Sequence, residues 1–214
     1  MEYVRDSHVY SKYYPMFAFM LETGLRRGEV FGLTWKDVSL ARRTININHQ
    51  LQYGARDGQM HFYIDTPKSD AGIRLIPLTS YATEMLSLQK EYQIAEHRQT
   101  EIPIDGYTGF VFSTKNNTPY VPSNINAVLA GIVSSYNDTH LNRKLPHITA
   151  HILRHTACTR MAEAGMDPKV LQYIMGHSSI SVTMNVYNHV SDDRNRKEIN
   201  KLDRKRRSLR EQTI

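Results

Sequence analysis

The spacing of apolar and polar residues divides the chain into a helical start, a strand-rich segment and a helical remainder. Apolar residues at helical spacing predict a first helix over 12–23 and a short second helix over 27–33. Alternating polar and apolar residues then predict a strand over 44–47. Two more strands are expected over 62–66 and 73–78. These three strands predict one small antiparallel sheet.

The rest of the chain shows helical periodicity interrupted by capping residues and glycines. Residues that can cap a helix, or a proline suited to its first turn, come before the apolar stripes. In the first of these helices Tyr81, Met85 and Leu88 are expected to face the core. The predicted helices begin near Ser80, Ser123, Thr149, Pro168 and Ser179. The pattern therefore predicts an α+β fold that is mainly helical.

Composition and charge narrow the class of protein. The 214 residues are 40% hydrophobic, which suits a globular protein with a buried core. Its apolar runs fall short of the roughly 18 to 20 residues of a membrane span, so no membrane partner is expected. The single Cys158 cannot form an internal disulfide, in keeping with a reducing cytoplasm. A net charge of +6 favours nucleic acid as the partner, although a generic basic protein has the same charge.

Two basic side chains near the start of the helix predicted over 149–164 form a first candidate anion site. His151 and Arg154 are three residues apart, so they leave the helix on one face. A histidine and an arginine side by side suit a phosphate. A solvated helix end would show the same pattern.

A second candidate site follows the stop signal Gly24. The guanidinium of Arg26 can bind two oxygens of one phosphate. Glu29 can pair with an arginine and hold its orientation, although a surface ion pair is the commoner reason for this spacing. The neighbouring Arg27 is expected to face outwards.

Three further residues could serve phosphate chemistry. Lys68 lies in a turn predicted over 68–72, which could reach into a DNA groove or simply keep the protein soluble. His177 follows the helix stop Gly176, where it could meet an anion or cap the helix. Tyr187 is one of 13 tyrosines, and a phenol with a pKa near 10 is a poor nucleophile unless cations stabilise its anion.

The order Arg, Lys, His-x-x-Arg, His, Tyr along the chain resembles the tyrosine recombinase family, also called the phage integrase family. The resemblance covers the chain from about Tyr14 to Val190, and its details look similar to integrases of conjugative transposons. It implies the fold of a tyrosine recombinase catalytic domain. The segments that carry it are TGLRRGEV at 23–30, TPKSDAGIRLIPL at 66–78, HILRHT at 151–156 and MGHSSISVTMNVYNH at 175–189.

The resemblance implies a catalytic role for each candidate residue. Tyr187 would attack the scissile phosphate and form a 3′-phosphotyrosine. Arg26 and Arg154 would hold the non-bridging oxygens and stabilise the charge that develops on them. Lys68 would protonate the leaving 5′-oxygen.

The remaining roles complete the site that the resemblance implies. His151 would assist the proton transfer from the tyrosine, and His177 would donate a hydrogen bond to the phosphate. Glu29 matches a supporting acidic position. No cofactor, metal ion or ATP is expected, because in-line attack needs positioning and positive charge.

Domain organisation and partners also follow from the resemblance. It implies a catalytic domain over 1–190 and a charged tail over 191–214 that is exchanged between subunits of a homo-oligomer, a tetramer, on double-stranded DNA. The N-terminal DNA-binding domain of family members is expected to be absent from this chain. The hairpin predicted over 51–63 could brace DNA or a partner's tail, or be a plain surface loop.

Two other functions share part of this pattern. A type IB topoisomerase uses a similar set of residues, but usually has lysine where this chain has His151. A non-enzymatic DNA-binding module would grip phosphates without forming a covalent bond.

Overall fold

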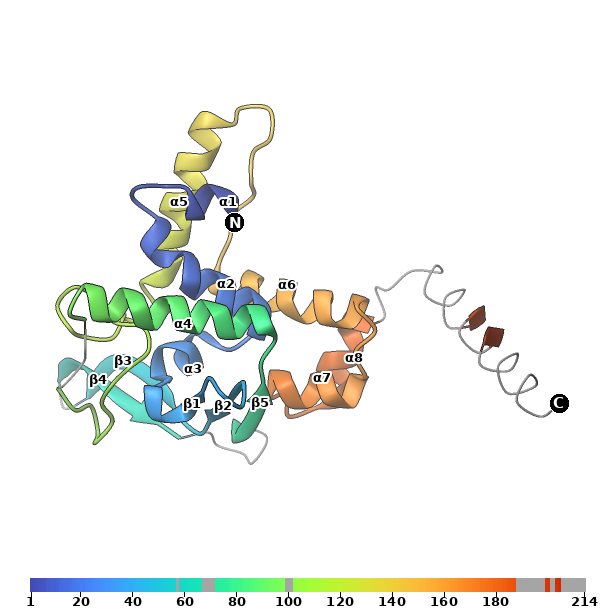
Figure 1. The fold of residues 1–214 in the computed structure, drawn as a ribbon, viewed down its shortest axis with the longest axis horizontal. Helices are drawn as coiled ribbons and strands as arrows, with labels where there is room; N and C mark the ends of the chain where they lie inside the picture. Colours follow the sequence, from blue (N-terminus) through green and yellow to red (C-terminus); the bar gives the residue numbers. More distant parts are fainter. Residues whose placement is uncertain (57, 67–71, 99–101, 188–198, 201–202, 205–214) are drawn as a thin grey trace.

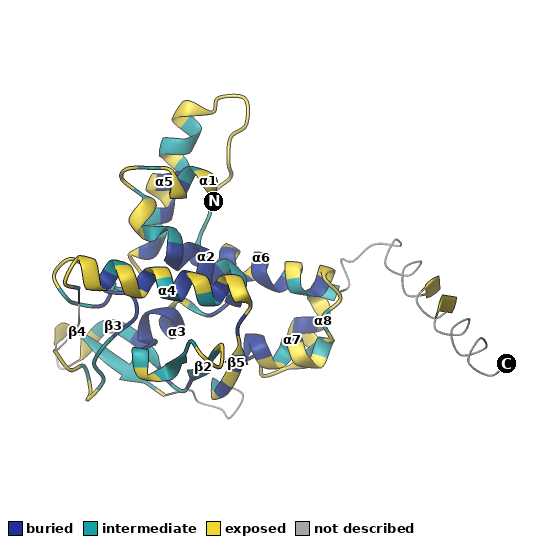
Figure 2. Cartoon of the chain, in the orientation of Figure 1, coloured by how far each residue is buried: buried dark blue, intermediate teal, exposed yellow. Residues whose placement is uncertain are grey.

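The structure is a computed structural model that describes residues 1–56, 58–66, 72–98, 102–187, 199–200 and 203–204. Helix α2 (Tyr14–Thr23) lies at its centre, between α4 (Ser80–Ala95) and α6 (Ala150–Glu163) (Figure 1). Residues on all sides of α2 are buried, and Figure 2 shows this helix mostly in the colour of buried residues. A helix that is apolar all round must be enclosed by protein, so α2 holds its neighbours in place.

The other helices surround this centre. The helix expected over 12–23 is confirmed from Tyr14 onwards, with Pro15 in its first turn and a short 3-10 helix before it. The remaining helices are α1 (Glu2–Arg5), α3 (Arg27–Gly32), α5 (Ile125–Thr139), α7 (Pro168–Met175) and α8 (Ile180–Tyr187), with 3-10 helices η1 (Ser11–Tyr13) and η2 (Trp35–Asp37). In the part of the chain that the structure describes, every helix is too short or too polar to span a bilayer.

The strands form two small sheets instead of the single predicted one. In the first, β1 (Val38–Ser39), β2 (Thr44–Ile47) and β5 (Arg74–Pro77) are antiparallel in the order β1-β2-β5. The second is a separate hairpin of β3 (Gln50–Arg56) and β4 (Gln59–Asp65). The prediction that 62–66 joins the strand at 73–78 is therefore wrong, because β4 pairs with β3 over seven residues while β5 pairs with β2.

Helix α4 buries a face that only partly overlaps the one predicted, since Met85 is buried as expected. Tyr81 and Leu88 are 38% and 41% exposed, so their expected place in the core is wrong. The buried face instead carries Gln89 and Gln93, whose side-chain amides donate hydrogen bonds of 3.0–3.1 Å to main-chain carbonyls in 110–112. These two glutamines supply hydrogen-bond donors to buried carbonyls of this segment, so glutamine is buried here and polarity alone does not identify the buried helix face.

Close backbone contact fixes α3 against the hairpin. A Cβ added at Gly32 would lie 2.8 Å from the main-chain nitrogen of Leu51 and 3.1 Å from the Cα of Gln50. The carbonyl of Gly32 is also 2.6 Å from Nε2 of His49. Since Arg26 and Glu29 lie at the start of the same helix, this contact positions them relative to the sheets.

We expect Gly32→Ala to lower the free energy of unfolding by about 2 kcal/mol, because the added methyl meets main-chain atoms that cannot rotate away. Chemical denaturation of the two proteins measures the difference. Gly54→Ala is the matched control, since a Cβ there meets only ordinary contacts at 3.5 Å or more. Equal stability of both variants would contradict the close-contact explanation.

Candidate functional site

Arg154 joins three segments beneath a surface cleft. It is 9% exposed and donates hydrogen bonds to the carbonyls of Gly24 (2.7 Å) and Met175 (2.6 Å). Burial, and next the positive charge of Arg26, lower the pKa of Arg154 to about 10. It therefore stays charged at neutral pH, and its guanidinium has further N–H groups beyond these two bonds.

Arg26 lies at the start of α3 and meets the same region from another side. Its Nη2 donates to the carbonyl of Gly176 (2.7 Å), and its Nη1 to Oε1 of Glu29 (2.9 Å). Glu29 also accepts a hydrogen bond from the main-chain nitrogen of Arg26, which caps the helix. Glu29 thus makes the arginine pair that its spacing suggests, and its supporting role in the site stays a prediction.

Both arginines are held by the C-terminal ends of helices. Gly24 ends α2 and Gly176 ends α7, each with positive φ. The last carbonyls of a helix lack intrahelical partners and carry partial negative charge, so they stabilise cations there. Two helix ends thus stabilise two guanidinium groups that would otherwise repel each other.

His177 follows directly after one of these helix ends. Its Nδ1 lies 3.0 Å from Oγ1 of the fully buried Thr183. Burial lowers the pKa of His177 to about 4, and the charges of Arg154 and Arg26 contribute to this lowering. The imidazole is therefore neutral at pH 7, and with Nδ1 on the hydroxyl its Nε2 can donate to an anion.

These side chains line one cleft of about 610 Å³. The predicted residues Arg26, His151, Arg154 and His177 are all brought together in it. Arg27 is exposed, as expected, and it also lines the cleft. The other described residues around it are Leu25, Asn126, Thr149, Ala150 and Val182. Arginine and histidine side chains, with no acidic side chain among the described lining residues, make the cleft suited to an anion.

Tyr187 lies elsewhere in this structure. Its hydroxyl donates a hydrogen bond to the carbonyl of Met166, which follows the far end of α6 from His151. Its ring packs beside a small apolar cluster around Cys158 and Leu171. In this structure an apolar cluster and a main-chain acceptor thus hold the ring and hydroxyl of Tyr187, and its role as the nucleophile stays a prediction.

The helix that carries Tyr187 nevertheless borders the site. Val182 lines the main cleft, and Asn185 and Val186 line an adjoining hollow of about 210 Å³ shared with His151, Arg154 and His177. Lys68 falls outside the described residues, so its expected place in the site stays a prediction. Within the described part of the chain, no group of three histidine, cysteine or acidic side chains is arranged to hold a metal ion.

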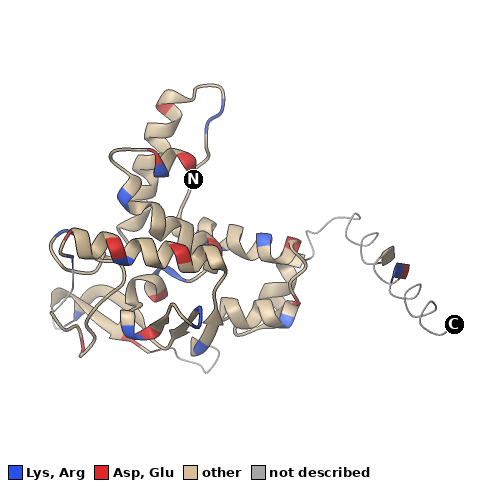
Figure 3. Ribbon diagram, viewed as in Figure 1, with Lys and Arg blue, Asp and Glu red and all other residues tan. Residues whose placement is uncertain are grey.

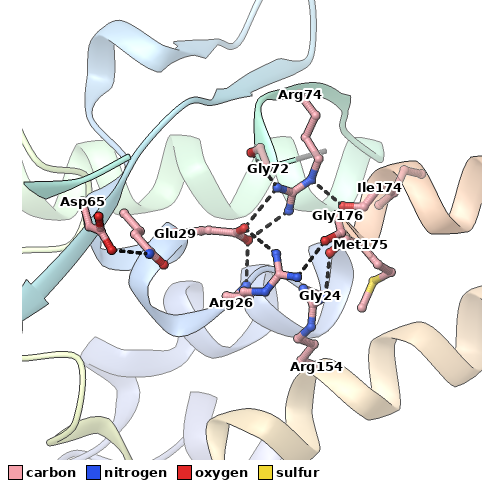
Figure 4. A network of polar contacts seen from close by, with 11 residues as sticks. Gly24, Arg26, Glu29, Asp65, Gly72, Arg74, Arg154, Ile174, Met175 and Gly176 are labelled. Carbon is pink, nitrogen blue, oxygen red and sulfur yellow. Dashed lines mark hydrogen bonds and ion pairs between the residues drawn. The ribbon is translucent and has the colours of Figure 1, made fainter. Parts of the chain in front are cut away.

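Sequence reasoning missed Arg74. Its side chain is fully buried and forms two hydrogen bonds with Glu29, as Figure 4 shows. An arginine within an otherwise apolar strand, RLIP, was the available signal. Figure 3 shows Lys and Arg residues spread over much of the ribbon, so charge distribution alone does not single out Arg74.

Comparison with known proteins identifies the family to which this chain belongs. The model of the Phage integrase family matches residues 1–194. The chain is 39% identical over 210 residues to the transposase from transposon Tn916 of Enterococcus faecalis, covering 98% of this chain and 50% of that protein. It is 32% identical over 187 residues to the integrase of Staphylococcus phage L54a, covering 85% and 49%. The chain spans about half the length of these relatives.

Solved structures show the same fold. The integrase of transposon Tn1549, in complex with transposon right end DNA, superposes with a TM-score of 0.83 at 36% identity, covering 94% of this chain and 62% of that one. XerA recombinase superposes with a TM-score of 0.60 at 20% identity, covering 93% and 59%, and shows the fold alone. The predicted α+β, mainly helical catalytic fold is confirmed. The chain belongs to the phage integrase family, the tyrosine recombinases.

Proposed function

We propose that the chain is the catalytic part of an integrase that cuts and rejoins double-stranded DNA during integration or excision of a mobile element. The observation that carries this proposal is the cleft in which Arg26, His151, Arg154 and His177 converge. The names of its relatives, a transposase and integrases, favour this function over a type IB topoisomerase or a non-catalytic module.

The proposed reaction exchanges one phosphoester bond for another: the bond from phosphorus to the 5′-oxygen is replaced by a bond from phosphorus to the tyrosine oxygen. The phenol oxygen of Tyr187 attacks phosphorus and gives its proton to His151, while the bond to the 5′-oxygen breaks. Lys68 protonates that leaving oxygen. The product is a 3′-phosphotyrosine and a free 5′-hydroxyl. Rejoining reverses these steps, and because the ester energy is conserved it needs no ATP.

The cleft supplies the stabilisation that this step needs. A pentavalent phosphorane carries more negative charge on its non-bridging oxygens than the diester does. Arg26 and Arg154 face those oxygens, and His177 donates a hydrogen bond from Nε2. In-line displacement of this kind depends on positioning and positive charge, which these residues provide.

Tyr187 has to leave the carbonyl of Met166 before it can react. Helix α8 already borders the cleft through Val182, so a change in the orientation of this helix would move the phenol toward the phosphate. We propose that DNA binding in the cleft favours this change, because the bound phosphate adds an attractive partner for the residues around it.

Incubation with nicked duplexes of varied central sequence, in which the cut strand cannot be rejoined, is expected to leave the chain covalently bound to DNA. Tyr187→Phe should form no such adduct, because the nucleophilic oxygen is gone. Denaturing gel electrophoresis separates the adduct from free protein.

Tyr173→Phe is the matched control. Tyr173 is an exposed tyrosine whose hydroxyl hydrogen-bonds the backbone of Leu75, so this variant should form the adduct at the wild-type rate. Adduct formation by Tyr187→Phe would rule out Tyr187 as the nucleophile. Exchange of strands between two labelled sites then separates a recombinase from a topoisomerase.

The neutral state of His177 makes stability depend on pH. Its pKa of about 4 lies below the value of about 6.5 for an unfolded histidine, so unfolding takes up a proton between these values. This contribution to stability is complete above about pH 6.5 and is lost as the pH falls toward 4. As the pH falls from 6.5 to 4, we expect the free energy of unfolding to decrease less for His177→Gln than for the wild type. Chemical denaturation at each pH measures this free energy.

The control for this measurement is His147→Gln, which removes an exposed histidine outside the cleft and should follow the wild-type curve. Bound phosphate should raise the pKa of His177, since its negative charge offsets that of the arginines. Parallel pH curves for wild type and His177→Gln would contradict the assignment of a neutral, half-buried imidazole.

We further propose that residues 191–214 dock on a neighbouring subunit and hold a tetramer together on DNA. The tail has nine Lys or Arg and five Asp or Glu, and few apolar residues, so it has little to bury against its own domain. Most of it lies outside the described residues. The role of the hairpin over 51–63 in bracing DNA or such a tail also stays a prediction.

Deletion of 191–214 is expected to reduce the size of the complex formed on DNA, because the link between subunits is removed. Sedimentation of protein with a duplex measures this size. Changing two exposed tail charges, Arg204→Ser with Asp203→Ser, is the matched control that keeps the net charge and should leave assembly intact. Complexes of unchanged size after deletion would reject the docking role.

A further inference from the structure

Arg74 is a fully buried charged residue behind the phosphate cleft. Its side chain is 0% exposed and donates from Nη1 and Nη2 to the two carboxylate oxygens of Glu29, at 3.0 and 2.9 Å. Its Nε donates to the carbonyl of Ile174 (2.9 Å), and Nη1 also to that of Gly72 (3.2 Å). Figure 4 shows this guanidinium on one side of Glu29 and Arg26 on the other.

The carboxylate of Glu29 is thus shared between two arginines. Burial raises the pKa of Glu29, but the hydrogen bonds and charge of Arg74, together with those of Arg26, outweigh it and lower the pKa below its usual value. Glu29 is therefore ionised although its side chain is 6% exposed. An ionised carboxylate this close to an anion site would repel a phosphate unless a cation offset its charge.

Arg74 is the cation placed to do so. Without it, Glu29 would pair with Arg26 alone, and that pair would carry no net charge. With it, Arg26 and Arg74 both pair with the carboxylate of Glu29, and Arg154, bonded to main-chain carbonyls, adds a third positive charge nearby. Three guanidinium groups and one carboxylate leave an excess of two positive charges. Only Arg26 and Arg154 of these three line the cleft, so Arg74 acts from behind it.

The packing around Gly176 holds this arrangement in place. A Cβ added there would lie 2.9 Å from both Cζ and Nη1 of Arg74 and 3.1 Å from Nη1 of Arg26. The backbone directly before His177 therefore lies against both guanidinium groups. Together with the bond from Arg74 to Ile174, this contact ties strand β5 to the end of α7.

We propose that Arg74 is a positioning residue of the phosphate site, which offsets the charge of Glu29 so that the charge of Arg26 remains available to the scissile phosphate. This inference rests on the proposed function and adds a residue to it. It predicts that the need for Arg74 depends on the negative charge of residue 29 and on the negative charge of the substrate.

The test compares Arg74→Met with the double variant Arg74→Met/Glu29→Gln, each against its parent. We expect Arg74→Met to slow adduct formation on nicked duplexes by about 100-fold, the usual scale for loss of one charge-stabilising group. In the Glu29→Gln background, Arg74→Met should slow adduct formation by less than about threefold, because no carboxylate remains to be offset.

A second substrate separates charge from folding. A methylphosphonate at the cleaved position replaces one charged oxygen with a methyl group, so its reaction needs less positive charge. We expect Arg74→Met to lose much less activity on this substrate than on the phosphodiester. A variant that was merely misfolded would lose both activities equally, and that result would overturn the proposal.

Two more variants complete the comparison. Arg74→Lys keeps the positive charge, so its rate of adduct formation should remain within about tenfold of the wild-type rate. This variant tests the proposal even if Arg74→Met does not fold. Arg98→Met, the control, removes another mostly buried arginine paired with Glu96 and should leave the rate unchanged. Charge compensation would be contradicted by equal losses with and without the Glu29→Gln change, or by an Arg74→Lys variant as slow as Arg74→Met.

The proposal can be judged separately from the proposed function. Binding of inorganic phosphate, followed through the NMR signal of the His177 imidazole, needs no covalent chemistry. Arg74→Met should weaken it about tenfold, and the double variant should restore it. If wild type forms no adduct but phosphate binding follows this pattern, the function is wrong and the role of Arg74 stands. Unchanged phosphate binding in Arg74→Met overturns that role.

Discussion

The gathering of positive charge around the buried carboxylate of Glu29 is the constraint on which the site depends. Arginines brought close together in a poorly solvated place repel one another, and the lowered pKa of Arg154 reflects both its burial and this repulsion. The structure offsets the repulsion in two ways, with one shared carboxylate and with main-chain carbonyls at helix ends. Without the carboxylate of Glu29, or without the carbonyls at the helix ends, a buried guanidinium group would lack the partners that offset its charge.

The fold can be understood as the means of bringing these partners together. Helix α2 ends at Gly24 and α7 ends at Gly176, and both ends point their carbonyls at arginines from other elements. Positive φ at these glycines lets the chain turn sharply there. A Cβ at Gly24 would also lie 2.9 Å from the sulfur of Met175, so the two helix ends are in direct contact. The central, mostly buried α2 fixes where this meeting point lies.

The sequence predicted the parts of this arrangement that depend on local spacing. His151 and Arg154 lie three residues apart within α6, so helical geometry places them together. Arg26 and Glu29 are the N-cap and third residue of α3, and the capping box places them together. Arg74 pairs with Glu29 across 45 residues, and its partner follows from strand placement that local spacing does not contain. Strand pairing failed for the same reason, since 62–66 has the same alternation whichever strand it joins. The face of α4 was missed because Gln89 and Gln93 are buried for their hydrogen bonds.

The position of Tyr187 follows from the same balance of charges. A neutral phenol gains little from a cluster of cations, whereas the carbonyl of Met166 offers its hydroxyl an acceptor. The cationic part of the cleft is already assembled, because helix ends and Glu29 hold it through contacts within the chain. A phosphate would change the balance by bringing negative charge to the arginines and an electrophilic centre to the phenol. If Tyr187 is the nucleophile as proposed, pre-assembled cations and a phenol held at Met166 make the proposed cleavage depend on correctly placed DNA.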